Sequence, residues 1–148
     1  MRKTGHIEEF IRLMGQFHKL QGKAALKDLD QAITPLQFGA LWYIVKHPRS
    51  SVGLLANYLG LSSSAIAQLT DRLVGSKFII RENDARDRRT VLLSATKRGS
   101  QTCMKLYKAR IQKMKKILAF MPEADLTELI RIFSTLLKKL QAERLRMG

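Results

Sequence analysis

The sequence predicts a mainly α-helical fold that carries one small β-hairpin. Apolar residues recur at steps of three and four near both ends of the 148-residue chain, which is the spacing of amphipathic helices. Helix-capping residues open shorter helices in the middle of the chain. After Gly75, two runs rich in β-branched residues replace the helical spacing, as expected for the strands of a hairpin.

Two helices are expected before the hairpin region. The apolar face of the first comprises Ile7, Phe10, Ile11, Met14 and Phe17. The second is predicted over residues 38 to 46. Thr34 is a good N-cap for it, Pro35 suits the first helical position, and Gln37 completes a capping box.

Two short helices around a glycine-containing turn come next. The first is predicted over residues 51 to 58, with Leu54, Leu55 and Leu59 as its apolar residues. Gly60 ends it, and Ser62 caps a second helix that reaches about Val74. The inward stripe of this second helix is Ile66, Leu69 and Leu73. Such a pair is typical of a helix-turn-helix.

The hairpin follows directly, with strands predicted at residues 78–80 and 90–93. The segment between them is charged and contains Asn83, Asp84 and Asp87, residue types that favour turns. A hairpin immediately after a helix-turn-helix predicts a winged helix-turn-helix.

The last third of the chain is expected to be helical. Thr96 caps a helix to about residue 120, and Pro122 either stops that helix or opens the next one. Heptad spacing places Met104, Tyr107, Ile111, Met114, Leu118 and Met121 on one seam, and Leu126, Leu129, Phe133, Leu136 and Leu140 on another. These seams must pack on each other, on the first helix or on a second subunit.

Charge narrows the classes of partner. The chain has 27 Lys and Arg against 12 Asp and Glu, a net charge of +15, which attracts polyanions such as nucleic acid. No apolar stretch has signal-peptide or membrane-span form, and the single cysteine, Cys103, suits a reducing compartment. We therefore expect a cytoplasmic protein without a membrane partner. No catalytic set, metal cluster or cofactor motif is visible, so an enzyme is not expected.

The helix from Ser62 exposes small polar residues that suit a DNA groove. Gln68 can pair with adenine through its amide, and small residues let the helix N-terminus approach the bases. The candidate contacts are Ser62, Ser63, Ser64, Ala67, Gln68 and Arg72. The alternative is an ordinary solvated helix face.

The hairpin tip is the second candidate DNA contact. Its candidate residues are Arg86, Asp87, Arg88 and Arg89, and arginines of this kind can enter a narrow minor groove. We expect Asp84 and Asp87 to hold neighbouring arginine side chains by bidentate pairing. The alternative is a charged, soluble loop.

These motifs resemble the MarR family of bacterial transcription regulators. The resemblance rests on the wing run Asp87–Leu92 and, in the family's order, on Leu55–Ser62, Leu69–Leu73, Arg81–Asp84 and Ser94–Gly99. Thr34–Phe38 also looks like the family's entry to the second helix. It implies a homodimer in which the end helices interlock, and a wing in which Asp87 orients Arg89 toward the minor groove. Many members release DNA when a small phenolic or anionic ligand binds.

Two positions depart from the family pattern. Lys77 stands where members often have glycine, so a left-handed backbone there would be strained, unless Gly75 shifts the helix end. No cysteine lies in the first helix, where peroxide-sensing members carry one, and Cys103 is expected to be a packing residue. Phe17, His18, Trp42 and Tyr43 are candidate residues of a ligand pocket near a helix junction. The alternative is that these rings are ordinary core residues.

The sequence therefore predicts three regions. These are an N-terminal dimerisation helix (1–33), a winged helix-turn-helix DNA-binding domain (34–99) and C-terminal dimerisation helices (100–148). The dimer interface is expected at Ile7, Phe10, Ile11, Met14 and the second C-terminal seam. The predicted function is sequence-specific repression from a pseudo-palindromic site on double-stranded DNA. The alternative is a non-specific architectural DNA-binding protein.

Overall fold

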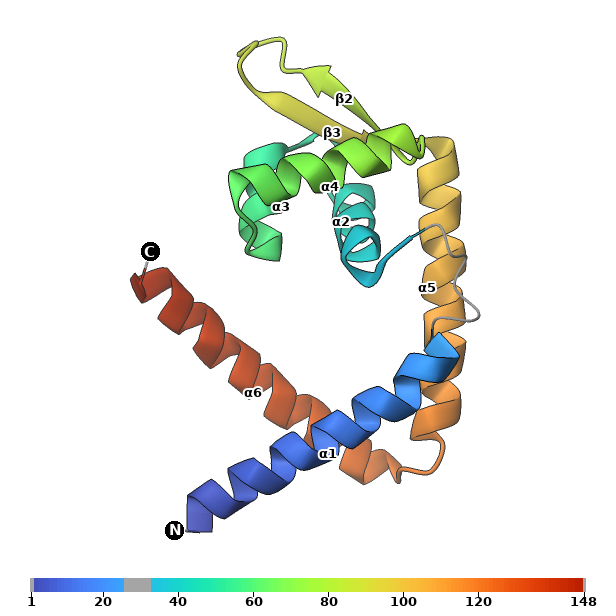
Figure 1. Cartoon of the computed structure of the whole chain (residues 1–148), viewed down its shortest axis with the longest axis vertical. Coiled ribbons are helices and arrows are strands. Elements are labelled where there is room, and N and C mark those ends of the chain that lie inside the picture. Colours follow the sequence, from blue (N-terminus) through green and yellow to red (C-terminus); the bar gives the residue numbers. More distant parts are fainter. Residues whose placement is uncertain (1, 26–32, 148) are drawn as a thin grey trace. The chain divides into compact units, whose positions relative to one another are not determined.

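The computed structural model describes residues 2–25 and 33–147, with the side chains of residues 3–17 and 33–146. It contains the predicted helices and hairpin (Figure 1). In chain order the elements are α1 (Arg2–Ala25), α2 (Pro35–Lys46), β1 (Ser50–Ser51), α3 (Val52–Leu59), α4 (Ser63–Gly75), β2 (Ile79–Asn83), β3 (Val91–Ala95), α5 (Lys97–Leu118) and α6 (Glu123–Met147). The chain divides into two compact units, residues 1–106 and 107–148.

The core of the first unit lies among α2, α3, α4, the sheet and the start of α5. Its fully buried side chains include Leu41, Ile44, Leu55, Leu93 and Cys103. The predicted inward stripe of α4, Ile66, Leu69 and Leu73, is buried. Of the apolar residues predicted for α3, Leu55 is fully buried, whereas Leu54 is 55% exposed.

The local signals for α2, α3 and α4 are confirmed. The Thr34 hydroxyl accepts a hydrogen bond from the backbone N–H of Gln37, and the Gln37 side chain accepts one from the N–H of Thr34. Ser51 and Ser62 cap α3 and α4, where each hydroxyl accepts a hydrogen bond from the backbone N–H three residues ahead. Gly60 ends α3 with a left-handed φ of 67°, a conformation that costs glycine little.

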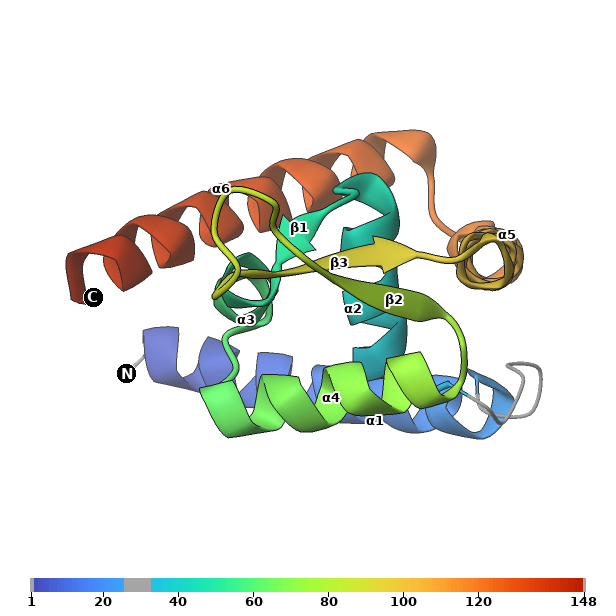
Figure 2. The same ribbon diagram turned by 90° about the horizontal axis from the view of Figure 1, so that it is seen from above.

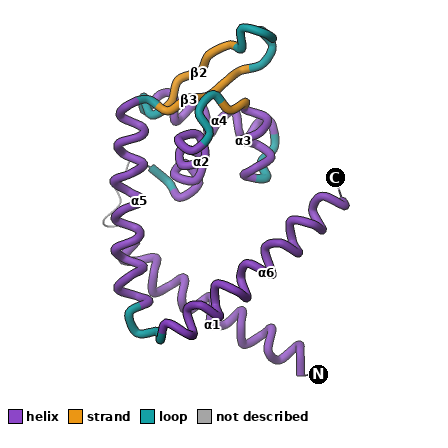
Figure 3. Tube along the Cα trace, turned by 180° about the vertical axis from the view of Figure 1, so that it is seen from behind, coloured by secondary structure: helices purple, strands orange, loops and turns teal. Residues whose placement is uncertain are grey.

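The strands form an antiparallel sheet in the order β1-β3-β2, with the hairpin extending from it (Figures 2 and 3). The hairpin strands run further toward the tip and toward α5 than predicted, with Asn83 paired to Val91 and Ile79 to Ala95. Strand β1 pairs with β3 and was not predicted. Two residues are too short to show a strand period.

Helix α4 ends in a Schellman motif. The N–H of Phe78 donates to the carbonyl of Leu73, and the N–H of Lys77 donates to that of Val74. This geometry places Lys77 at the position usually held by glycine, and its φ is 59°. The expectation of a strained Lys77 is confirmed. The alternative that Gly75 takes this role is wrong, because Gly75 has no positive φ.

The backbone of Phe78 lies very close to the segment that leads from β3 into α5. The carbonyl of Phe78 accepts hydrogen bonds from the N–H and the hydroxyl of Thr96, at 3.0 and 3.2 Å. The hydroxyl of Thr96 in turn accepts from the N–H of Gly99 and so caps α5. A β-carbon at Gly99 would lie 1.9 Å from the Phe78 carbonyl oxygen. Glycine is therefore required at that position by packing.

The apolar faces of the long helices are exposed in the single chain. On α1, the exposed large apolar side chains are Ile7, Phe10, Ile11, Leu13, Met14 and Phe17, and on α6 they include Ile130, Phe133, Leu136, Leu137 and Leu140. Leu126 and Leu129 are half-buried. Pro122 opens α6, since its carbonyl accepts from the N–H of Leu126.

Among the described residues, no single helix combines the length and hydropathy of a membrane span. Helices α3 and α4 pass such a test only together, across a 110° bend.

Candidate nucleic-acid interface

Helix α4 presents a polar face opposite its buried stripe. All six predicted contacts, Ser62, Ser63, Ser64, Ala67, Gln68 and Arg72, are exposed. The Ser62 hydroxyl is engaged as the N-cap and lies 3.3 Å from the Ser64 hydroxyl. Ala67 and Gln68 lie one turn further along, so the structure gathers small residues and one amide at the helix start. This face is narrow and polar enough to enter a major groove.

Arg81 connects the hairpin to α4. One guanidinium nitrogen lies 2.6 Å from the hydroxyl of Thr70, and another lies 2.7 Å from the carboxylate of Asp71. Thr70 is fully buried and also donates to the carbonyl of Ile66. Arg81 therefore satisfies a buried hydroxyl and links β2 to α4. No sequence signal singled out Arg81 or Thr70 for this contact.

The hairpin tip keeps its arginine side chains on the surface. Arg86, Asp87, Arg88 and Arg89 are all exposed. The expectation that Asp84 and Asp87 pair with arginine side chains is wrong. Asp84 instead accepts from the backbone N–H of Arg86, and Asp87 accepts from that of Arg89, both at 3.0 Å.

These Asp contacts are turns of the kind that Asp forms with the backbone two residues ahead. The second carboxylate oxygen of Asp87 also accepts from the Thr90 hydroxyl at 3.1 Å. Asp87 thus shapes the loop around Arg89 and leaves the guanidinium of Arg89 free of that carboxylate. The guanidinium can then contact a phosphate or a groove edge.

A second ion pair lies on the opposite face of the sheet. Arg49, just before β1, donates to the carboxylate of Glu82 on β2 at 2.8 Å, and its backbone N–H bonds to the Ser94 hydroxyl. Alternation along β2 puts Glu82 on the face opposite Arg81. Arg49 also has a left-handed φ of 60°. No signal in the sequence marked it.

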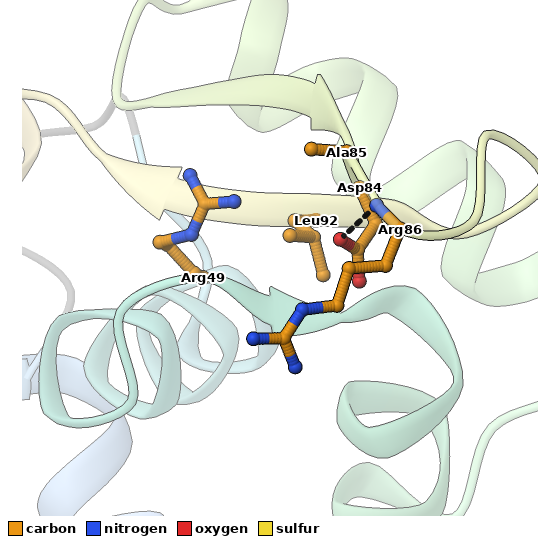
Figure 4. A pocket seen from close by; sticks show the side chains of 5 residues that line it. All are labelled: Arg49, Asp84, Ala85, Arg86 and Leu92. Atoms are coloured by element: carbon orange, nitrogen blue, oxygen red, sulfur yellow. Dashed lines mark hydrogen bonds between the residues drawn. The ribbon is translucent and has the colours of Figure 1, made fainter.

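A solvent-open hollow of about 370 Å³ lies on that face at the base of the hairpin tip. Its lining residues are Arg49, Asp84, Ala85, Arg86 and Leu92. Figure 4 shows the side chains of Arg49 and Arg86 flanking Leu92. None of the four residues predicted for a ligand pocket lines this hollow.

Two of those predicted pocket residues lie together on α2. The ring of Tyr43 lies 4.5 Å from the rings of both His47 and Tyr58, and the ring of Trp42 has the ammonium of Lys46 at 4.8 Å. Phe17 lies exposed on α1. The side chain of His18 is outside the described residues.

Cys103 packs in the core, as expected. Burial raises the pKa of its thiol, an effect that the nearby charge of Lys46 partly opposes. A thiol in this environment is a weak nucleophile. Within residues 2–25 and 33–147, no group of three or more His, Cys, Asp or Glu side chains could hold a metal ion.

The part of the chain that contains the capped helix pair and the arginine hairpin matches a known family model. Residues 33–90 match the MarR family model, a span from the start of α2 to the end of the hairpin tip. Over this span, which is less than half of the chain, the sequence is similar to the MarR family.

The similarity to MarR-family proteins extends beyond the matched span. The chain is 27% identical over 126 residues to the HTH-type transcriptional repressor MdtR of Bacillus subtilis (strain 168), covering 85% of this chain and 81% of MdtR. FabT from Streptococcus pneumoniae, solved in complex with DNA, has a TM-score of 0.79 at 18% identity, covering 94% of this chain and 98% of the FabT chain. The PcaV transcriptional regulator from Streptomyces coelicolor, solved with its natural ligand, has a TM-score of 0.69 at 20% identity, with coverages of 90% and 91%. These structures confirm the fold.

Proposed function

We propose that this chain is a member of the MarR family and a sequence-specific DNA-binding transcription regulator that acts as a repressor. The observation that carries the proposal is the pairing of two exposed elements. One is the small polar face at the start of α4, and the other is the arginine tip whose backbone Asp84 and Asp87 hold in turns. The relationship to the repressor MdtR supports the regulatory role, and we propose no catalytic step for it.

In this function α4 enters the major groove and the hairpin tip reaches the adjacent minor groove. Gln68 and the serines at the helix start would contact base edges, while Arg86, Arg88 and Arg89 would contact the minor groove and its phosphates. A net charge of +15 speeds the approach to DNA and makes affinity fall steeply with salt.

We further propose a cytoplasmic homodimer whose interface uses the exposed apolar faces of α1 and α6. Two copies would contact a pseudo-palindrome with half-sites about 10 base pairs apart. A small phenolic or anionic ligand would release the DNA, with Phe17, His18, Trp42 and Tyr43 as its candidate contacts. Trp42 and Tyr43 are half-buried neighbours on α2, and the ring of Tyr43 packs against those of His47 and Tyr58.

The deciding experiment is selection of bound fragments from random duplex DNA by the full chain, followed by titration of the selected and scrambled duplexes at several salt concentrations. A regulator should prefer the selected duplex by about 10³-fold or more. Similar affinity for both duplexes would contradict the proposal and favour an architectural DNA-binding protein.

A further inference from the structure

The hairpin sheet has two distinct faces, and each carries one bridging arginine. Arg81 contacts α4 from the first face. Arg49 contacts Glu82 on the second face, and Leu92, which pairs with Glu82 in the register, lies on that face too. The hollow at the base of the hairpin tip therefore opens on the side of the hairpin away from α4.

A hairpin tip in a minor groove has one DNA backbone on each side. The groove is only about 6 Å wide, so the phosphates of the second strand must pass close to the face opposite α4. We propose that the hollow is a binding site for a backbone phosphate of duplex DNA, with Arg49 as its central contact. This inference rests on the proposed function.

The donors around the hollow suit a phosphate. The guanidinium of Arg49 has five N–H groups, it forms an ion pair with Glu82, and its side chain is 57% exposed. The carboxylate therefore orients Arg49 and leaves further donors for a second anion. Arg86 supplies another exposed guanidinium from across Leu92.

Two features reduce the repulsion between a bound phosphate and Asp84, the acidic residue that lines the hollow. The carboxylate of Asp84 is engaged by the backbone N–H of Arg86 at 3.0 Å. Ser51, the N-cap residue of α3, pairs in the sheet with Leu92, one of the residues that line the hollow. The first N–H groups of a helix lack intrahelical partners and carry the positive end of its dipole.

The backbone of Arg49 allows an unusually clean test. Arg49 and Lys77 are both basic, exposed and at positive φ, 60° and 59°. Replacing either by glycine removes one charge and relieves backbone strain. Lys77, however, follows α4 at the end of the sheet away from the hairpin tip, so Lys77→Gly is the matched control for Arg49→Gly.

The experiment titrates wild type, R49G and K77G with the selected duplex and a scrambled one. Urea unfolding checks that both variants stay folded. We expect R49G to bind both duplexes on the order of tenfold more weakly, with the salt slope reduced by about 0.9 for each phosphate that is no longer bound. K77G should change affinity less than about threefold, because screening weakens distant charges. Equal effects of R49G and K77G would overturn the site.

A third variant separates phosphate binding from a purely structural brace. Glu82→Gln removes the ion pair but keeps the Arg49 guanidinium, so the phosphate site predicts unchanged or tighter binding. Weakening equal to that of R49G would overturn the proposal, since Arg49 would then act only by holding β2. In ethylation interference, R49G should become insensitive to ethylation at one backbone phosphate that affects wild type.

The two proposals fail in different ways. If wild type binds both duplexes equally, sequence-specific regulation is contradicted, while the comparison of R49G with K77G still decides the phosphate site.

Discussion

Lys77 occupies a backbone conformation that favours glycine, and it does so at the end of α4. Its φ of 59° allows the Schellman hydrogen bonds to Leu73 and Val74. A side chain with a β-carbon is strained there. We therefore expect Lys77→Gly to raise the free energy of unfolding by about 1 kcal/mol, measured by urea denaturation. A loss of stability would show that the Lys77 side chain contributes more than its backbone costs.

Gly99 is constrained by its neighbours and not by its backbone conformation, because there is no room for a side chain. A β-carbon there would meet the Phe78 carbonyl oxygen at 1.9 Å, and that oxygen also accepts from Thr96. We expect Gly99→Ala to lower the free energy of unfolding by roughly 3 kcal/mol. Gly75→Ala is the matched control, because nothing lies within 4 Å of its β-carbon position. If both variants unfold at the same urea concentration, the close approach of α5 is wrong.

At the scale of elements, Arg81 adds a polar bridge between β2 and α4 to their apolar packing. Its guanidinium bonds both the buried Thr70 hydroxyl and the Asp71 carboxylate. We expect Arg81→Met to lower the free energy of unfolding by about 1–2 kcal/mol, since it leaves a buried hydroxyl with an unfilled acceptor. The same substitution should also weaken DNA binding, because the angle between the hairpin and α4 is then no longer fixed by this contact. Arg88→Met, at the exposed tip, should leave stability unchanged.

The hairpin tip itself is expected to act on DNA and not on stability. Arg89 is exposed, and Asp87 holds its backbone rather than its side chain. We expect Arg89→Ala to weaken binding to the selected duplex by about 1–3 kcal/mol, measured by fluorescence anisotropy at moderate salt. Unchanged affinity would remove the tip from the interface. Asp87→Asn should have a smaller effect, because an amide oxygen can still accept from the N–H of Arg89.

At the scale of the whole molecule, the apolar faces of the long helices require a partner surface. Leu136 and Leu140 on α6 are 48% and 57% exposed, within a row of exposed apolar residues that water solvates poorly. We expect the wild-type chain to sediment as a dimer at micromolar concentration. The double variant Leu136→Glu, Leu140→Glu should sediment as a monomer and bind the selected duplex far more weakly, since two linked half-sites contribute to affinity.

The control for this prediction is Leu54→Glu on α3, which changes an exposed leucine outside the long helices and should leave the dimer intact. A wild-type chain that sediments as a monomer would contradict the dimer.

The sequence by itself determined every helix of the winged unit and the existence of the hairpin. The reason is that these depend on local chemistry. Thr34, Ser51 and Ser62 cap the turns that follow them, Gly60 permits a left-handed residue, and the stripe on α4 repeats at the helical period. The candidate DNA contacts on α4 were also predictable, because one face of a helix is visible from spacing alone.

Only the tertiary structure decided how these elements are joined. The pairing of Arg81 with Thr70 and Asp71, and of Arg49 with Glu82, spans strands or helices distant in sequence. Strand β1 exists because β3 offers its free edge. The roles of Asp84 and Asp87 were decided by loop geometry, in which the backbone N–H two residues ahead lies closer than any guanidinium. Such contacts depend on chain approach, which spacing along the sequence does not encode.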